Sequence, residues 1–187
     1  MSKPVIVFDL DDTLFETREW FKKYLNVMGV ACPQTDDYRI EEYVDPALIE
    51  FALDQGSYMT EAKPVEGAQH YINRLIAAGY TTGFCTHRGY HPKAGEKTVQ
   101  GLYKWDLMIE GFEGVVLDSR AYPCKMKFLD NLHSKYVLVD DDPTAVRTAK
   151  GQVIIYDRPW NRNITNAPRI YGLDGLMSAI ENLTWPN

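Results

Sequence analysis

Short runs of apolar and β-branched residues recur along the chain and alternate with longer stretches of helical periodicity. The runs have the length of strands, and their mostly continuous hydrophobicity is typical of strands buried on both faces of a sheet. Strands that alternate with helices predict an α/β fold with a mostly parallel sheet covered by helices. The predicted strands are Val5–Phe8, Tyr80–Cys85, Val115–Leu117, Lys135–Val139 and Val153–Tyr156.

The helical stretches have apolar residues three or four positions apart and are bounded by Gly or Pro. After the first strand, helices are expected at 16–29 and, in two pieces divided near Pro46, at 38–55, with a loop at 32–37 between them. These helices are too many for one crossover between strands, so we expect a core formed by 1–15 and 64–187 and a small helical insertion at 16–63. The later helices are predicted at 64–78, 94–105, from Pro123 onward, 144–150 and 172–183.

Carboxylates follow the first predicted strand directly, where a buried strand would tolerate them only for a purpose. Asp9 and Asp11 lie two residues apart, so in extended backbone their side chains point to the same side. Two like charges so close together favour a bound cation. Capping of the next helix accounts for Asp12 or Thr13, but it does not account for Asp9.

The strand at 135–139 also ends in carboxylates, Asp140, Asp141 and Asp142. Pro143 at the first position of a helix makes Asp142 a good N-cap, which leaves Asp140 and Asp141 to be explained. Thr86 stands at the end of the strand at 80–85. Ligands of parallel sheets bind beyond the carboxyl ends of the strands, so we expect one pocket to collect these residues.

Basic residues gather in two places. The stretch 88–104 contains Arg88 and three lysines against a single acid, and it either attracts an anion or forms a solvated helix face. Lys125 lies near the start of a predicted helix, where the helix dipole does not favour a cation, which suggests a specific role. Lys127 is the alternative for that role.

Composition sets outer limits on function. The chain has 187 residues, 45% of them hydrophobic and 25% charged, which is typical of one soluble folded domain. No apolar run has the length of a membrane span, and the N-terminal apolar stretch lacks a cleavage site, so we expect a cytoplasmic protein without a membrane partner. A net charge of −6 argues against a protein that coats nucleic acid. Three cysteines without CxxC spacing, Cys32, Cys85 and Cys124, suit reduced thiols rather than disulfides or a zinc site.

The stretch FDLDDTL at 8–14 resembles the first motif, DxDxT, of the haloacid dehalogenase (HAD) superfamily of phosphohydrolases. The resemblance implies a Rossmann-like core with the helical insertion as a cap beside the active site. It implies that Asp9 attacks phosphorus and that Asp11 acts as general acid and then base. By the same resemblance, Thr86 donates its hydroxyl to the phosphate, and Lys125 offsets the negative charge.

The resemblance also implies a metal site for Mg²⁺, whose preferred ligands are carboxylate and phosphate oxygens. The implied ligands are Asp9, the backbone carbonyl of Asp11 and Asp141, with Asp140 as the alternative to Asp141. The reaction would then be the hydrolysis of a phosphomonoester through an aspartyl-phosphate.

Two further stretches bear on the substrate. YDRPWNR at 156–162 resembles a segment of 5′(3′)-deoxyribonucleotidases, which implies a nucleoside deoxymonophosphate with Arg88 as a second phosphate or sugar contact, although many of those enzymes have Gly in place of Asp12. THRGYHPK at 86–93, with the later DSR and Lys125, resembles the phosphatase domain of polynucleotide kinase phosphatases and implies a 3′-phosphate on a nucleic-acid end. The third hypothesis, a HAD domain that binds without catalysis, is disfavoured by the intact set of aspartates and lysine. The sequence has no signal for a particular oligomeric state.

Overall fold

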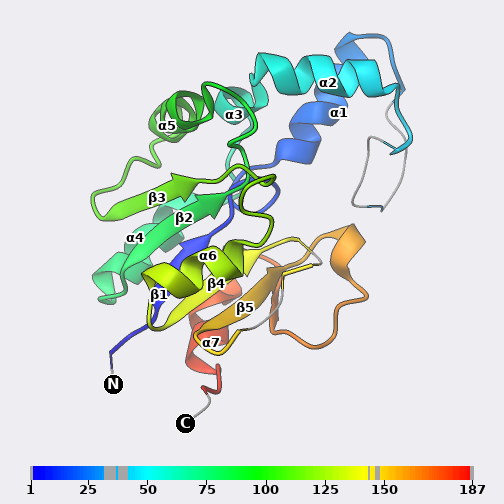
Figure 1. The fold of residues 1–187 in the computed structure, drawn as a ribbon. Coiled ribbons are helices and arrows are strands. Elements are labelled where there is room, and N and C mark those ends of the chain that lie inside the picture. The colour runs from blue at the N-terminus through cyan, green and yellow to red at the C-terminus, as the bar shows by residue number, and fades with distance from the viewer. Residues whose placement is uncertain (1, 32–36, 38–41, 143, 146–147, 186–187) are drawn as a thin grey trace.

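The computed structural model describes residues 2–31, 37, 42–142, 144–145 and 148–185 of the chain. Within these residues, six strands form one sheet in which every neighbouring pair runs parallel, in the order β3-β2-β1-β4-β5-β6 (Figure 1). The α/β class and the parallel sheet predicted from the sequence are confirmed. The strands are β1 Val5–Phe8, β2 Thr82–Thr86, β3 Phe112–Val116, β4 Tyr136–Asp140, β5 Gly151–Tyr156 and β6 Arg169–Ile170.

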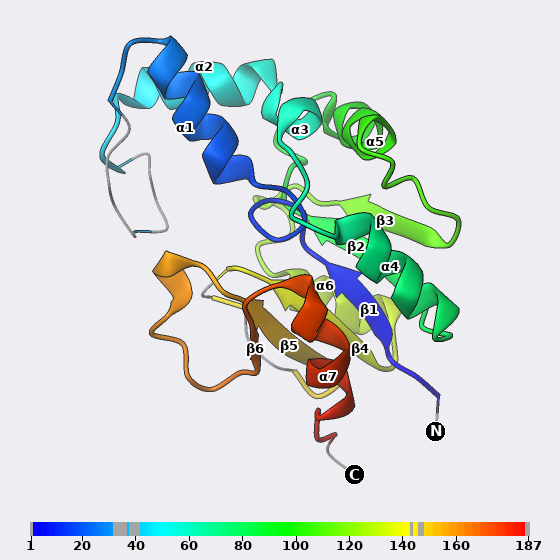
Figure 2. The same ribbon diagram turned by 180° about the vertical axis from the view of Figure 1, so that it is seen from behind.

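Helices cover both faces of the sheet, which is why its central strands are hydrophobic throughout. Successive side chains of a strand point to opposite faces, so Ile6 and Phe8 join one buried cluster and Val7 joins another. Helices α4, α5 and α7 contribute to the first cluster and α6 to the second, and Figure 2 shows α4 and α7 on the same face. The helices are α1 Thr17–Val27, α2 Pro46–Gln55, α3 Tyr58–Glu61, α4 Ala68–Ala77, α5 Ala94–Lys104, α6 Lys125–Leu132 and α7 Leu176–Glu181, with 3₁₀ turns η2 Pro159–Asn161 and η3 Leu173–Gly175.

Helices α1, α2 and α3 lie beyond the carboxyl ends of the strands (Figure 1). They share a third buried cluster, to which α5 contributes Ala94. Contact between α3 and α5 is close: a Cβ on Gly101 of α5 would lie 2.1 Å from the carbonyl oxygen of Met59, so only glycine fits. The chain enters and leaves this helical segment side by side, with hydrogen bonds from Val65 N to Leu14 O and from Glu16 N to Lys63 O, of 2.9 and 2.8 Å.

The helix predicted at 144–150 is wrong for the residues that the structure describes there. Thr144 lies in a turn, and the Asp142 carboxylate accepts hydrogen bonds from both its backbone N–H and its hydroxyl. The capping bond predicted for Asp142 therefore forms, but no helix follows it in the described residues. Further on, Thr148 and Gly151 bond to each other and close the turn into β5. Pro143 lies outside the described residues.

Other elements begin or end at residues that differ from the prediction, and one strand was not predicted. The predicted C-terminal helix is a 3₁₀ turn followed by the six residues of α7. Strand β6 has two residues, too few for any periodic signal. The edge strand β3 begins at Phe112 rather than Val115, because its exposed Glu113 and Gly114 conceal it in the hydrophobic pattern. Most of the predicted loop at 32–37, including Cys32, and the start of the helix at 38–55 lie outside the described residues.

Candidate active site

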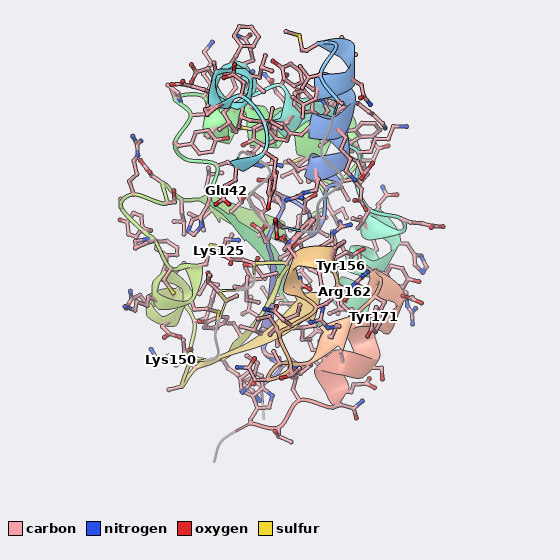
Figure 3. All side chains as sticks on the ribbon, turned by 90° about the vertical axis from the view of Figure 1, so that its right-hand side faces the viewer. Glu42, Lys125, Lys150, Tyr156, Arg162 and Tyr171 are labelled. Carbon is pink, nitrogen blue, oxygen red and sulfur yellow. The ribbon has the colours of Figure 1, made fainter. Side chains whose placement is uncertain are left out.

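Three polar residues meet at the carboxyl ends of the central strands. Asp9 follows β1, Asp140 ends β4 and Lys125 begins α6; the side chains of all three are buried. Lys125 Nζ lies 2.7 Å from Asp9 Oδ1 and 2.9 Å from Asp140 Oδ2. In Figure 3, Lys125 lies on the side of the helical segment, whereas Lys150, just before β5, lies at the other end of the sheet. The alternative to Lys125, Lys127, is exposed.

Asp141 completes a cluster of three carboxylates. Oxygens of Asp9, Asp140 and Asp141 lie within 4.8 Å of one another. Thr13 donates its hydroxyl to Asp141 Oδ1 at 3.1 Å, and the indole N–H of Trp160 donates to Oδ2 at 3.0 Å. No described residue forms a salt bridge with Asp141, so its charge has neutral hydrogen-bond donors but no counter-ion.

The electrostatics of this cluster favour a bound cation. Burial raises the pKa of Asp9 to about 7, although Lys125 opposes the shift. Burial and the neighbouring carboxylates raise the pKa of Asp141 well above its usual value. Burial alone would lower the pKa of Lys125, but Asp140 and Asp9 outweigh it and raise that pKa well above normal. One ammonium group cannot neutralise three carboxylates, so oxygens of this cluster form a suitable site for a divalent metal ion.

Asp11 faces a different partner. Arg88 binds its carboxylate with two parallel hydrogen bonds, Nε to Oδ2 at 2.9 Å and Nη2 to Oδ1 at 2.7 Å. Thr17 adds its hydroxyl to Oδ1 at 2.7 Å. Burial acts to raise the pKa of Asp11, but the charge and hydrogen bonds of Arg88 outweigh it, so the pKa of Asp11 lies below its usual value. As the structure stands, Asp11 is ionised and fixed in orientation.

Arg88 is not part of an exposed basic face. Its side chain is 1% exposed, and its guanidinium carbon lies 5.5 Å from the ring centre of Phe15 and 5.6 Å from that of Tyr58. Tyr58 belongs to α3, so the helical segment reaches directly to the partner of Asp11. Of the lysines in the same stretch, Lys104 pairs at the surface with Glu61. The residues from 88 to 104 therefore do not act as one basic patch.

The hydroxyl of Thr86 lacks a described partner, whereas Asp12 and Thr13 each bind another part of the chain. Thr86 is fully buried at the end of β2, and its hydroxyl has no described hydrogen-bond partner, a state that costs about 1–3 kcal/mol unless a ligand supplies an oxygen. Asp12 accepts a 2.8 Å hydrogen bond from Arg18 N at the start of α1, and burial raises its pKa to about 6. Asp12 therefore takes the capping role, and Thr13 binds Asp141 instead.

The segment 157–162 contains site residues whose roles the sequence did not predict. Trp160 binds the side chain of Asp141, and the Asn161 amide donates to the Asp141 carbonyl at 2.9 Å. The motif YDRPWNR marked this segment as functional. It could not indicate these bonds, because their partner lies about twenty positions earlier in the chain.

A cleft of about 680 Å³ opens beside the same segment. Arg158 lines it and is already bound to Glu16, with Nη1 3.0 Å from Oε2. The excess of acidic groups would repel a phosphate, so the phosphate of a substrate is better placed near Lys125 and Thr86. The acidic residues that line the cleft are Glu16, Glu66, Asp157 and Asp174.

Comparison with known proteins relates this arrangement to a fold. No protein-family model matches the chain. A protein of Bordetella pertussis, provisionally named a 5′(3′)-deoxyribonucleotidase, is 26% identical over 176 residues, which cover 89% of this chain and 90% of that protein. A crystal structure of a predicted phosphatase from Clostridium acetobutylicum has a TM-score of 0.63 and 19% identity, covering 98% of this chain and 100% of that one. The chain has the fold of the HAD hydrolases.

A second structure of a HAD hydrolase has a similar fold. A HAD family hydrolase from Deinococcus radiodurans, solved with bound phosphate and sodium, covers 98% of this chain and 99% of that chain, with a TM-score of 0.59 at 17% identity. In the HAD fold of the present chain, the cluster around Lys125 lies at the carboxyl ends of β1 and β4, next to the sheet's centre. No helix in the described part of the chain is long and apolar enough to cross a membrane.

Within this HAD fold, Asp11→Asn and Asp141→Asn should change stability in opposite directions. Asp11→Asn leaves buried Arg88 without a carboxylate, and loss of one partner of a buried pair costs about 3 kcal/mol. The Asp141 carboxyl is harder to ionise in the fold than in the unfolded chain, because burial raises its pKa, so Asp141→Asn should stabilise the protein by about 1 kcal/mol. Thermal unfolding in EDTA at about pH 8 measures both, at roughly 2–4 °C per kcal/mol.

The matched control is Asp106→Asn, an exposed site with φ of 55° that Asn adopts as readily as Asp. It should leave the melting temperature unchanged. A melting temperature of Asp141→Asn below that of the wild type would contradict the description of Asp141 as an uncompensated charge.

Proposed function

We propose that this protein is a cytoplasmic, Mg²⁺-dependent phosphomonoester hydrolase that acts through an aspartyl-phosphate, with nucleoside deoxymonophosphates as its substrates. The observation that supports this most directly is the cluster of Asp9, Asp140 and Asp141 around Lys125. Its carboxylates have one ammonium group between them, and Asp9 lies directly after a central strand, at the edge where parallel sheets bind their ligands.

The donor set fits Mg²⁺, which binds carboxylate oxygens and keeps some of its waters. Asp9 and Asp141 would hold the ion together with the carbonyl of Asp11, and Lys125 engages Asp140 instead. Asp141 is the better ligand of the two neighbours because no described cation neutralises it. Bound there, Mg²⁺ supplies positive charge that offsets the phosphate of the substrate.

A phosphomonoester carries about two negative charges near neutral pH and repels a carboxylate nucleophile. Lys125 reduces this repulsion because its ammonium group lies 2.7 Å from Asp9 Oδ1. The hydroxyl of Thr86, which lacks a partner in the described structure, can donate to a phosphate oxygen. Asp9 then forms a bond to phosphorus while the bond to the leaving alcohol breaks, which gives an aspartyl-phosphate.

Asp11 is the proton-transfer group of this proposal. It protonates the leaving alcohol and afterwards removes a proton from the water that hydrolyses the aspartyl-phosphate. The ionised state that Arg88 favours suits the second step. For the first step, the charge of a bound phosphate raises the pKa of Asp11 and competes for the guanidinium, so that Asp11 can carry the proton it donates.

The helical segment at 16–63 is proposed as a cap over this site. Its α3 places the ring of Tyr58 against Arg88, which in turn binds Asp11. A substrate held between cap and sheet would be shielded from water. The preference for a nucleotide rests on YDRPWNR and on the names given to the Bordetella proteins, and the acidic chain, with its basic residues dispersed, argues against binding along a strand.

Asp9→Asn tests the function directly. The substitution keeps the shape of the side chain but removes the nucleophile, so release of phosphate from p-nitrophenyl phosphate should fall by more than about 10⁴-fold. Asp106→Asn should retain the wild-type rate. Turnover by Asp9→Asn at the wild-type rate would exclude the mechanism, and a wild-type protein that binds phosphomonoesters without turnover would be a binding domain instead.

Removal of metal should abolish turnover, and added Mg²⁺ should restore it. The pKa of Asp9 rises on folding from 3.8 to about 7, so the folded protein holds a proton that the unfolded chain releases, and the metal-free fold loses stability as the pH rises through that range. Mg²⁺ bound at this site would replace the proton on the Asp9 carboxyl group. The difference in melting temperature between Mg²⁺ and EDTA should therefore widen from about pH 5 to about pH 8. A difference that shrinks with pH would contradict this metal site.

Two substrate classes are separated by kcat/KM measured at two salt concentrations. Deoxynucleoside monophosphates should be preferred over a 3′-phosphorylated oligonucleotide by about tenfold or more, with little effect of salt, because the site meets one or two phosphates. A protein that binds along a single strand loses affinity with a slope of about −0.7 per neutralised phosphate. Preference for the oligonucleotide that weakens steeply with salt would favour the processing of nucleic-acid ends.

A further inference from the structure

Trp160 holds one of the two oxygens of Asp141. Its indole N–H donates to Asp141 Oδ2 at 3.0 Å, while Thr13 donates to Oδ1 at 3.1 Å. Asp141 is buried, so these bonds are not replaced by water. Each oxygen thus has a fixed donor and still has lone pairs left for another partner.

The position of Trp160 is itself fixed by its neighbour. Asn161 is fully buried, and its amide donates to the carbonyl oxygens of Asp141 and Tyr156, both at 2.9 Å. Its own Oδ1 accepts a 2.6 Å hydrogen bond from Arg169 of β6. Arg169 also pairs with Asp157 at 2.7 Å. Hydrogen bonds of Asn161 and the ion pair of Asp157 therefore hold the segment 157–162 against β5, β6 and the backbone of Asp141.

The chemical nature of the donor matters. Asp140 receives the ammonium group of Lys125, which neutralises part of its charge. Trp160 donates from an uncharged indole, which orients a carboxylate without cancelling its charge. Asp141 is therefore held in one orientation without an ion pair to a described side chain.

We propose that Trp160 is a positioning residue that holds the Asp141 carboxylate in the orientation required by a divalent cation. The proposal rests on the metal site of the proposed function. Groups that orient a metal ligand in this way typically change metal affinity by 10- to 100-fold when they are removed.

The ring of Trp160 has a second contact that the test must preserve. The guanidinium carbon of Arg18, near the start of α1, lies 4.1 Å from its ring centre. Trp160→Phe keeps an aromatic face for Arg18 and removes the N–H donor together with one ring of the indole. The matched control is Trp105→Phe, because the indole of Trp105 also donates a hydrogen bond, to Thr60 O at 3.2 Å, but outside the site.

The experiment measures binding of Mn²⁺ alone to the full chain by electron paramagnetic resonance, without substrate. Trp160→Phe should raise the Kd for Mn²⁺ by about 10- to 100-fold, and Trp105→Phe should leave it unchanged. Turnover of Trp160→Phe should require correspondingly more Mg²⁺ but approach the wild-type kcat when Mg²⁺ is saturating. A general loss of structure would lower kcat at every metal concentration.

Wild-type affinity for Mn²⁺ in folded Trp160→Phe would overturn the proposal while leaving the metal site intact. A wild-type protein that binds no Mn²⁺ would overturn the metal site of the proposed function as well. Should Trp160→Phe fail to fold, the assigned indole N–H resonance of Trp160 in the wild type provides a second measurement. Added Mg²⁺ should shift it and leave that of Trp105 in place, and the lack of a shift would overturn the proposal.

Discussion

Three buried carboxylates repel one another at the end of the central strands, and the arrangement around them serves to contain that repulsion. Lys125 stands between Asp9 and Asp140 and neutralises only part of the charge. Neutral donors, Thr13 and Trp160, hold Asp141 without reducing its charge further. A protein selected for stability alone would replace such a cluster by apolar residues or by balanced pairs. The excess charge is therefore best understood as attraction reserved for a ligand.

The members of this cluster come from different elements of the fold, and apolar packing of those elements holds them together. The central strands β1 and β4 have hydrophobic clusters on both faces, and this packing holds the backbone at their carboxyl ends. Asp11 belongs to a separate arrangement, in which Arg88 cancels its charge. Two aspartates only two positions apart thus have opposite pKa shifts: burial outweighs the Lys125 ion pair at Asp9, whereas Arg88 outweighs burial at Asp11. Division of roles between neighbouring carboxyl groups is a general route to acid, base and nucleophile in one site.

The strands β1 to β5 and the residues at their ends could be predicted from the sequence because both follow from local patterns. Asp9, Thr86 and Asp140 stand directly after buried runs, and Lys125 is conspicuous as a cation at a helix start. The partner of Arg88 could not be predicted, because its orientation depends on Tyr58 and Phe15 from other parts of the chain. The bonds of Trp160 were hidden for the same reason. At 144–150 the expected capping bond of Asp142 forms, but the described residues there turn into β5 through the bonds between Thr148 and Gly151 instead of forming a helix.

The close contact between Gly101 of α5 and the backbone of Met59 restricts how the helical segment can move. Backbone packed against backbone leaves no side chain that can rearrange to absorb a displacement, and the two backbone hydrogen bonds between 14–16 and 63–65 hold the segment at a second point. Attached at two places, the segment cannot swing away as a freely hinged lid. For the cap proposed above, access to the site would then depend on local loosening of the parts far from both attachments. The distance over which those parts can move, and not the length of the whole helical segment, would then limit the size of a solute that can enter.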